Sequence, residues 1–144
     1  MEPGGVREHL TGLREALLRL HKALIESERT DFEKTFGRIA SPYQFLHLLT
    51  TDPWFAWLRP LSQLVAEMDE TLDAKEPLTA VAADALAGQA KRLLVPLADG
   101  DGFSGHYDEA LQRDPDVVFA HAAMFKLFRK QPCAAAALPP QPVH

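Results

Sequence analysis

The sequence predicts an all-α protein, folded as an irregular bundle of four to six helices. Apolar residues recur at intervals of three and four over most of the chain, and this spacing places side chains along one face of a helix. No segment shows the alternation of apolar and polar residues that is typical of a half-buried strand. Three times a proline follows a serine or an aspartate, a pair that favours the cap and first residue of a helix.

The first predicted helix spans residues 6–32 and has the clearest pattern. Six apolar residues follow one another at spacings of 4, 3, 4, 3 and 4: Val6, Leu10, Leu13, Leu17, Leu20 and Leu24. Leu18 and Ile25 widen this stripe on one side. A widened stripe favours a helix that faces a bundle core, whereas a strict one is typical of the seam of a coiled-coil dimer.

The second long helix is predicted over residues 53–73, with a break inside it. Pro60 has no N–H group to donate to the carbonyl oxygen of Ala56, and its ring crowds that carbonyl. We therefore expect a kink or a break near residues 57–59.

The third long helix is predicted over residues 78–97, and its apolar face is thin because many of its residues are alanines. That face is expected to hold Leu78, Val81, Ala82, Ala85, Leu86, Gln89, Leu93 and Leu97. The glycines and aspartates of residues 99–105 indicate a loop. Shorter helices are predicted at 42–50, 108–113 and 115–130. The inner face of the last one is expected to hold Val117, Val118, Ala122, Met124, Phe125 and Phe128.

The chain length of 144 residues is that of one ordinary domain. We expect residues 1–130 to form this single helical domain. Residues 131–144 contain four prolines and no aspartate, glutamate, lysine or arginine, which is typical of a disordered tail.

The composition argues against several classes of partner and compartment. The net charge is −5 and no basic segment stands out, which argues against a nucleic-acid partner. No apolar run approaches the roughly 20 residues that cross a membrane. The N-terminus lacks the features of a secretory signal, and the single cysteine, Cys133, has no second cysteine to pair with. We expect a cytoplasmic protein.

The six histidines raise the question of a metal centre. None of them has a glutamate three residues before it, and no pair is spaced as two zinc ligands on a helix. His21 and His121 lie on or beside predicted apolar stripes, where a histidine usually bonds a backbone carbonyl. Ligation of a metal or haem by these two residues is the less favoured interpretation, and we expect no cofactor. No motif for a nucleophile or an acid–base pair appears, so no catalytic residue is predicted.

The segment Thr51–Ser62, TDPWFAWLRPLS, contains both tryptophans of the chain. Its first turns are apolar over most of their circumference, which favours burial in the core. In the alternative, one aromatic side chain stays outside beside an arginine, as in interaction hot spots. The candidate surface for a ligand or partner is His47, Asp52, Trp54, Phe55, Trp57 and Arg59.

These observations favour a non-enzymatic helical module for protein interaction or regulation. Its partner would be another protein or a second copy of the chain, which would make a homodimer. The alternative is small-molecule binding in a bundle pocket lined by the segment from Trp54 to Arg59. A buried cavity beside the tryptophans would favour the small-molecule alternative over the interaction module.

One resemblance adds to this expectation. The run from Ile39 to Glu70, which contains SPYQFLHLLTTDPWFAWLRPLSQLVAEMDE, is similar to small all-helical bacterial proteins of uncharacterised function. The resemblance implies a bacterial cytoplasmic origin and carries no activity to any residue.

Overall fold

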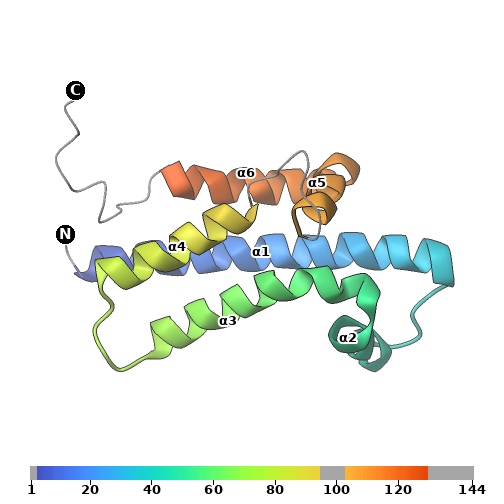
Figure 1. The fold of residues 1–144 in the computed structure, drawn as a ribbon, viewed down its shortest axis with the longest axis horizontal. Coiled ribbons are helices and arrows are strands. Elements are labelled where there is room, and N and C mark those ends of the chain that lie inside the picture. Colours follow the sequence, from blue (N-terminus) through green and yellow to red (C-terminus); the bar gives the residue numbers. More distant parts are fainter. Residues whose placement is uncertain (1–2, 95–102, 130–144) are drawn as a thin grey trace.

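The computed structural model describes residues 3–94 and 103–129. Within these ranges the chain forms six α-helices and one 3-10 helix and has no strand, so the predicted all-α fold is confirmed (Figure 1). The predicted tail, residues 131–144, lies outside the described residues, as does most of the predicted loop at 99–105.

Helix α1 (Pro3–Phe36) is the axis of the molecule. Its 34 residues span about 50 Å at the usual rise of an α-helix. Helices α3 (Arg59–Asp73) and α6 (Pro115–Arg129) run antiparallel to it, and α4 (Ala80–Leu94) runs in the same direction (Figure 1). All six residues of the predicted stripe are buried, so the core-facing assignment of this helix is confirmed.

The predicted break before Pro60 is present. The 3-10 helix η1 (Pro53–Leu58) precedes α3, and the backbone N–H of Arg59 donates to the carbonyl oxygen of Ala56. Short 3-10 helices, in which hydrogen bonds join residues i and i+3, commonly connect α-helical segments. The change to this pattern suits Pro60, which has no N–H group to donate to the carbonyl oxygen of Ala56. The segment before the break is therefore 3-10 and not α-helical.

The predicted face of α4 was wrong in part. Val81 is 69% exposed, and Ala82, Ala85 and Gln89 are also exposed. The buried residues are Leu86, Ala87, Ala90 and Leu94. The helix turns its small residues Ala87 and Ala90 inwards because it packs against both α1 and α3, where a small side chain permits close approach.

Helix α5 (Phe103–Arg113) begins five residues before the predicted start at 108. Tyr107 is fully buried, and the ring of Phe103 packs against it. These two aromatic residues extend the helix into the segment predicted as a loop. On α6, Val117, Met124 and Phe128 are buried as predicted, whereas Val118 and Ala122 are exposed.

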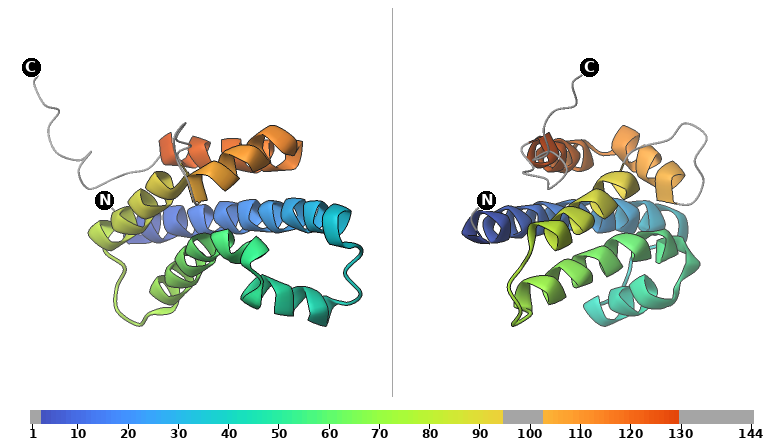
Figure 2. Two further views of the ribbon diagram at one scale, coloured as in Figure 1. Left: turned by 45° about the vertical axis from the view of Figure 1, so that its right-hand side comes forward. Right: turned by 60° about the vertical axis from the view of Figure 1, so that its left-hand side comes forward.

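Helix α2 (Pro42–Thr51) lies at the edge of the molecule, near the end of α1 (Figure 2). Gly37 ends α1 with a φ of +97°, a conformation that favours glycine. Ser41 then caps α2 by accepting a hydrogen bond from the N–H of Gln44. No residue of α2 is buried, and Phe45, Leu48 and Leu49 pack against the core while still partly exposed.

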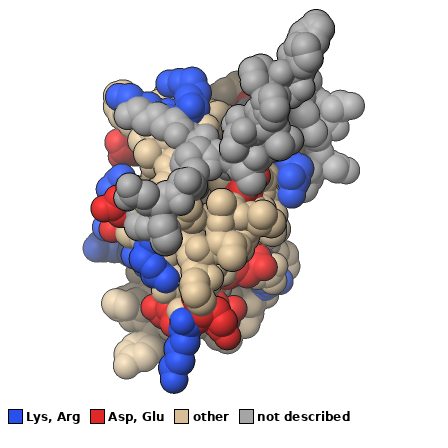
Figure 3. Space-filling view, turned by 90° about the vertical axis from the view of Figure 1, so that its left-hand side faces the viewer, with Lys and Arg blue, Asp and Glu red and all other residues tan. Residues whose placement is uncertain are grey.

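The opposite end of the molecule, where α1 begins, carries acidic and basic side chains side by side around an uncharged area (Figure 3). None of the helices in the described ranges combines the length and the apolar character needed to cross a membrane.

Candidate functional site

The aromatic side chains of the segment after Asp52 pack against different parts of the core. Trp54 is half-buried and packs edge-on against Phe32 and Phe36 of α1, with ring centroids 5.7 and 5.6 Å away. Trp57 is buried at the other end of η1, where its ring stacks on His106 of α5 at 5.1 Å. The two tryptophans therefore contact different helices and do not line one shared surface.

Phe55 is almost completely buried and contacts Phe32 and Phe45. It therefore joins α1, η1 and α2. The indole N–H groups of Trp54 and Trp57 are both buried and have no hydrogen-bond partner among the described residues. The burial of this segment agrees with the interpretation that it serves mainly as core.

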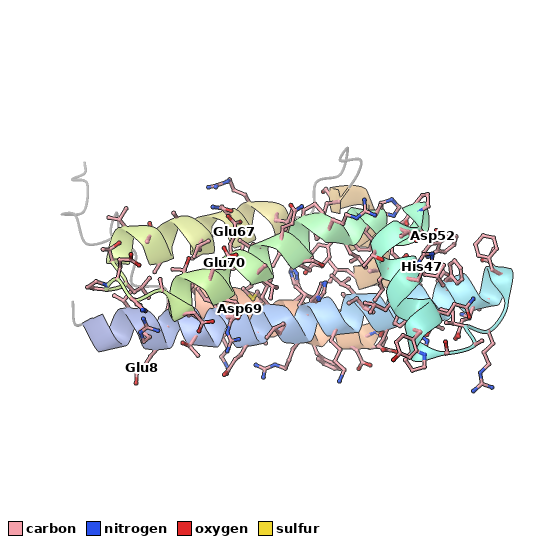
Figure 4. All side chains as sticks on the ribbon, turned by 90° about the horizontal axis from the view of Figure 1, so that it is seen from below. Glu8, His47, Asp52, Glu67, Asp69 and Glu70 are labelled. Carbon is pink, nitrogen blue, oxygen red and sulfur yellow. The ribbon has the colours of Figure 1, made fainter. Side chains whose placement is uncertain are left out.

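The polar residues of the predicted surface do not gather around the tryptophans. His47 is exposed on α2, and its carbonyl oxygen accepts hydrogen bonds from the hydroxyls of Thr50 and Thr51 (Figure 4). Asp52 caps η1, because its carboxylate accepts the N–H of Trp54 at 2.8 Å. Arg59 is exposed and donates to the carbonyl oxygen of Thr50 at 2.9 Å, which ties the end of α2 to the start of α3.

Two histidines bond a hydroxyl from another helix, where a backbone carbonyl was expected. The Nε2 atom of His21 lies 2.7 Å from the Oγ atom of Ser62, and Nδ1 of His121 lies 2.6 Å from the phenol oxygen of Tyr107. Burial lowers the pKa of both imidazoles below its usual 6.5, so both rings are neutral near pH 7. No cluster of three metal-ligating side chains occurs in residues 3–94 and 103–129.

A groove with a volume of about 700 Å³ lies between the end of α1 and helix α2. We call it the outer groove. It is lined by Arg29, Arg38, Ile39, Ala40, Ser41, Pro42, Phe45, Leu46 and Leu49. Seven of these lining residues carry no charge and the other two are arginines, so the groove combines an apolar floor with positive charge.

A smaller pocket, with a volume of about 330 Å³, lies on the other side of α2. We call it the inner pocket. It is lined by His21, Ile25, Leu46, Leu49, Thr50, Phe55, Leu58, Arg59 and Ser62. Leu46 and Leu49 line both hollows, and they are therefore shared walls.

The inner pocket contains Phe55 and Arg59 from the predicted surface and neither tryptophan. Sequence reasoning missed Arg38, Tyr43, Leu46 and Ser62. The spacing of Tyr43 and Leu46 could have identified one face of α2, since residues three apart are neighbours on a helix. No local signal could have identified Ser62, because its partner lies 41 residues away.

The pair of His21 and Ser62 has the spacing of a base and a nucleophile. A catalytic version of this pair also needs a group that orients the imidazole and donors for an oxyanion. In the part of the chain that the structure describes, His21 has no second hydrogen-bond partner. The arrangement supports hydrogen bonding to a bound molecule better than it supports acyl transfer.

Comparison of the chain with protein-family models, with curated proteins and with solved structures gave no match.

Proposed function

We propose that the protein is a non-enzymatic interaction module, which binds an apolar and acidic segment of a partner protein in the outer groove. The observation that carries this proposal is the exposure of α2. Tyr43 is 86% exposed and Leu46 is 59% exposed, and no residue of the helix is buried. Clusters of exposed apolar side chains usually mark sites of interaction.

The side chains that line the outer groove, and the exposed Tyr43 that follows the lining residue Pro42 in the sequence, support a protein partner. Tyrosine and arginine are enriched among the residues that dominate binding energy at interfaces. Tyr43 and Leu46 lie three apart and so present one face of α2. Phe36, at the end of α1, adds a third large apolar side chain with 64% exposure at this end of the molecule.

The charge of the outer groove supports an acidic segment in the partner. Arg29 lies over the ring of Phe45 at 4.9 Å and makes a long ion pair of 3.7 Å with Glu33. The carboxylate of Glu33 is also engaged, since it accepts the N–H of Ile39 at 2.8 Å. Arg38 is exposed and has no ion pair within the described ranges. Its guanidinium is therefore available to a carboxylate of the partner.

Site-specific photo-crosslinking tests this function. A benzophenone side chain is placed at Tyr43, and in a matched control at Val81, which is exposed on α4. Irradiation is carried out in the cells that make the protein, and the crosslinked peptides are identified by mass spectrometry. The expected result is one partner segment that is apolar and acidic, captured from position 43 and not from position 81, and lost in an Arg38→Glu variant.

Two results would contradict the proposal. Crosslinks to a second copy of this chain would make the outer groove a homodimer interface. Equal and unselective capture from positions 43 and 81, unaffected by Arg38→Glu, would show that the groove has no specific protein partner.

A further inference from the structure

The inner pocket has the size of a small-molecule site, and like such sites it combines apolar walls with a few polar groups. Its volume of about 330 Å³ falls at the lower end of the usual range of about 300–1,000 Å³ for such sites. At a liquid-like volume of about 30 Å³ for each non-hydrogen atom, it would hold roughly ten of them. Four elements form the walls, namely α1, α2, η1 and the start of α3.

The apolar walls come mainly from α1, α2 and η1. They consist of Ile25, Leu46, Leu49, Phe55 and Leu58. Phe55 and Leu58 are fixed in the core, whereas Leu46 is mostly exposed to solvent. A ligand that covered Leu46 would remove apolar surface from water, and this burial is favourable.

Three further lining residues, His21, Arg59 and Ser62, provide polar side chains. Arg59 and Ser62 lie three apart at the start of α3 and therefore share a face. His21 reaches the same place from α1 and bonds the hydroxyl of Ser62. The imidazole is neutral because burial lowers its pKa, so the serine hydroxyl can either donate to a ligand or accept from one.

Arg59 has donors left for a ligand. It uses one N–H group on the carbonyl oxygen of Thr50, and a guanidinium carries five. No carboxylate lines the pocket, and none is paired with Arg59 in residues 3–94 and 103–129. A guanidinium with free donors beside a hydroxyl matches the two oxygens of a carboxylate.

We propose that the inner pocket binds a small monocarboxylate with an apolar chain of about eight carbons, the size that the volume of the pocket allows. The carboxylate accepts hydrogen bonds from Arg59 and Ser62, and the chain lies between Leu46 and Leu49 on one side and Phe55 and Leu58 on the other. This site is distinct from the outer groove, and the proposal does not depend on a protein partner.

Isothermal titration calorimetry with octanoate tests the proposal, with octan-1-ol as the uncharged probe. The full chain is expected to bind octanoate saturably at one site. Arg59→Gln is expected to weaken octanoate binding about 10- to 100-fold, the range for a lost hydrogen bond to a charged group. Octan-1-ol binding should be the same in both proteins. Arg19→Gln, an exposed arginine on another groove between α1 and α6, should leave both affinities unchanged.

The octan-1-ol measurement separates recognition of charge from a change in the shape of the pocket. Arg59 also ties α2 to α3, so its loss would move Leu46 if the tie controlled the pocket. In that case the affinity for octan-1-ol would fall together with that for octanoate, and the assignment of Arg59 as the carboxylate-binding residue would be wrong. The absence of saturable octanoate binding to the unaltered protein would overturn the proposal as a whole. Failure of the crosslinking experiment above would leave it standing.

Discussion

The phenol oxygen of Tyr107 lies 2.6 Å from Nδ1 of His121 and joins α5 to α6 inside the core. Burial raises the pKa of Tyr107 and lowers that of His121, so both groups are neutral near pH 7, and the tautomer of His121 decides which of them donates the hydrogen bond. Stacked rings surround this bond, since Phe103 lies on Tyr107 and Phe125 lies on His121.

Removing this hydrogen bond should destabilise the protein. Tyr107→Phe leaves the half-buried Nδ1 atom of His121 without its partner, at an expected cost of about 1–2 kcal/mol in the free energy of unfolding. Urea denaturation monitored by circular dichroism measures this difference. Tyr43→Phe removes the same hydroxyl from an exposed side chain and should change the free energy by less than about 0.5 kcal/mol. Equal effects of the two substitutions would show that the bond contributes nothing.

Mild acid should destabilise the folded protein through three histidines. Burial holds the pKa values of His9, His21 and His121 below 6.5 in the folded state, whereas the unfolded chain has the usual value of 6.5. Below pH 6.5 the unfolded state therefore binds more protons, and the free energy of unfolding falls as the pH falls. Above pH 6.5 the contribution is fully present.

Urea titrations at several pH values between about 5 and 8, the range in which histidines change charge, measure this slope. His121→Phe removes one of the three groups and should make the slope shallower. A free energy of unfolding that is constant over this range, or that rises in acid, would contradict the burial of these imidazoles.

The fold was more predictable than the candidate sites, for a physical reason. The orientation of α1 follows from six apolar residues at regular spacing. Because all six lie on one face of the helix, they can be buried together only if that face turns toward the core. The face of α4 was mispredicted because alanine is nearly neutral between core and surface, so Val81 appeared to mark a core face that it does not occupy. The start of α5 was missed because Phe103 follows glycines and aspartates that favour a loop.

The inner pocket could not be predicted because it joins residues that are far apart in the sequence, from His21 to Ser62. His21 and Ser62 are 41 residues apart, and Arg113 and Ser27 are 86 residues apart. Nothing in the sequence close to any of these four residues specifies which distant residue it bonds. The segment after Asp52 was identified as important from its composition, but η1 directs its two tryptophans to different helices.

The ion pair between Arg113 and Glu28 should contribute much more stability than the pair between Arg14 and Asp69. Arg113 donates to Glu28 at 2.7 Å, and only 8% of the side chain of Glu28 is exposed. Arg113→Met would leave this carboxylate buried without a cation, and should cost about 2–3 kcal/mol, reduced from the fully buried value because Arg113 itself is partly exposed.

The matched control is Arg14→Met, which breaks the ion pair of 2.8 Å with Asp69 between α1 and α3 (Figure 4). Asp69 keeps nearly half of its surface in water, so the expected cost is below about 1 kcal/mol. Urea denaturation of the two variants gives the comparison. An Arg14→Met variant that loses as much stability as Arg113→Met would refute the ranking by burial.

Leu46 offers a test of binding that is separate from stability. Its side chain is 59% exposed and it lines both the outer groove and the inner pocket. Because truncation of an exposed side chain rarely affects folding, Leu46→Ala should change the free energy of unfolding by less than about 0.5 kcal/mol. The same substitution should weaken octanoate binding in calorimetry and reduce crosslinking from position 43.

Val81→Ala, an exposed truncation far from both hollows, should change none of the three measurements. Leu58→Ala, at a buried position of the same pocket, should instead cost about 2–5 kcal/mol. If Leu46→Ala leaves both kinds of binding intact, α2 is not the binding element, and its exposed leucine needs another explanation.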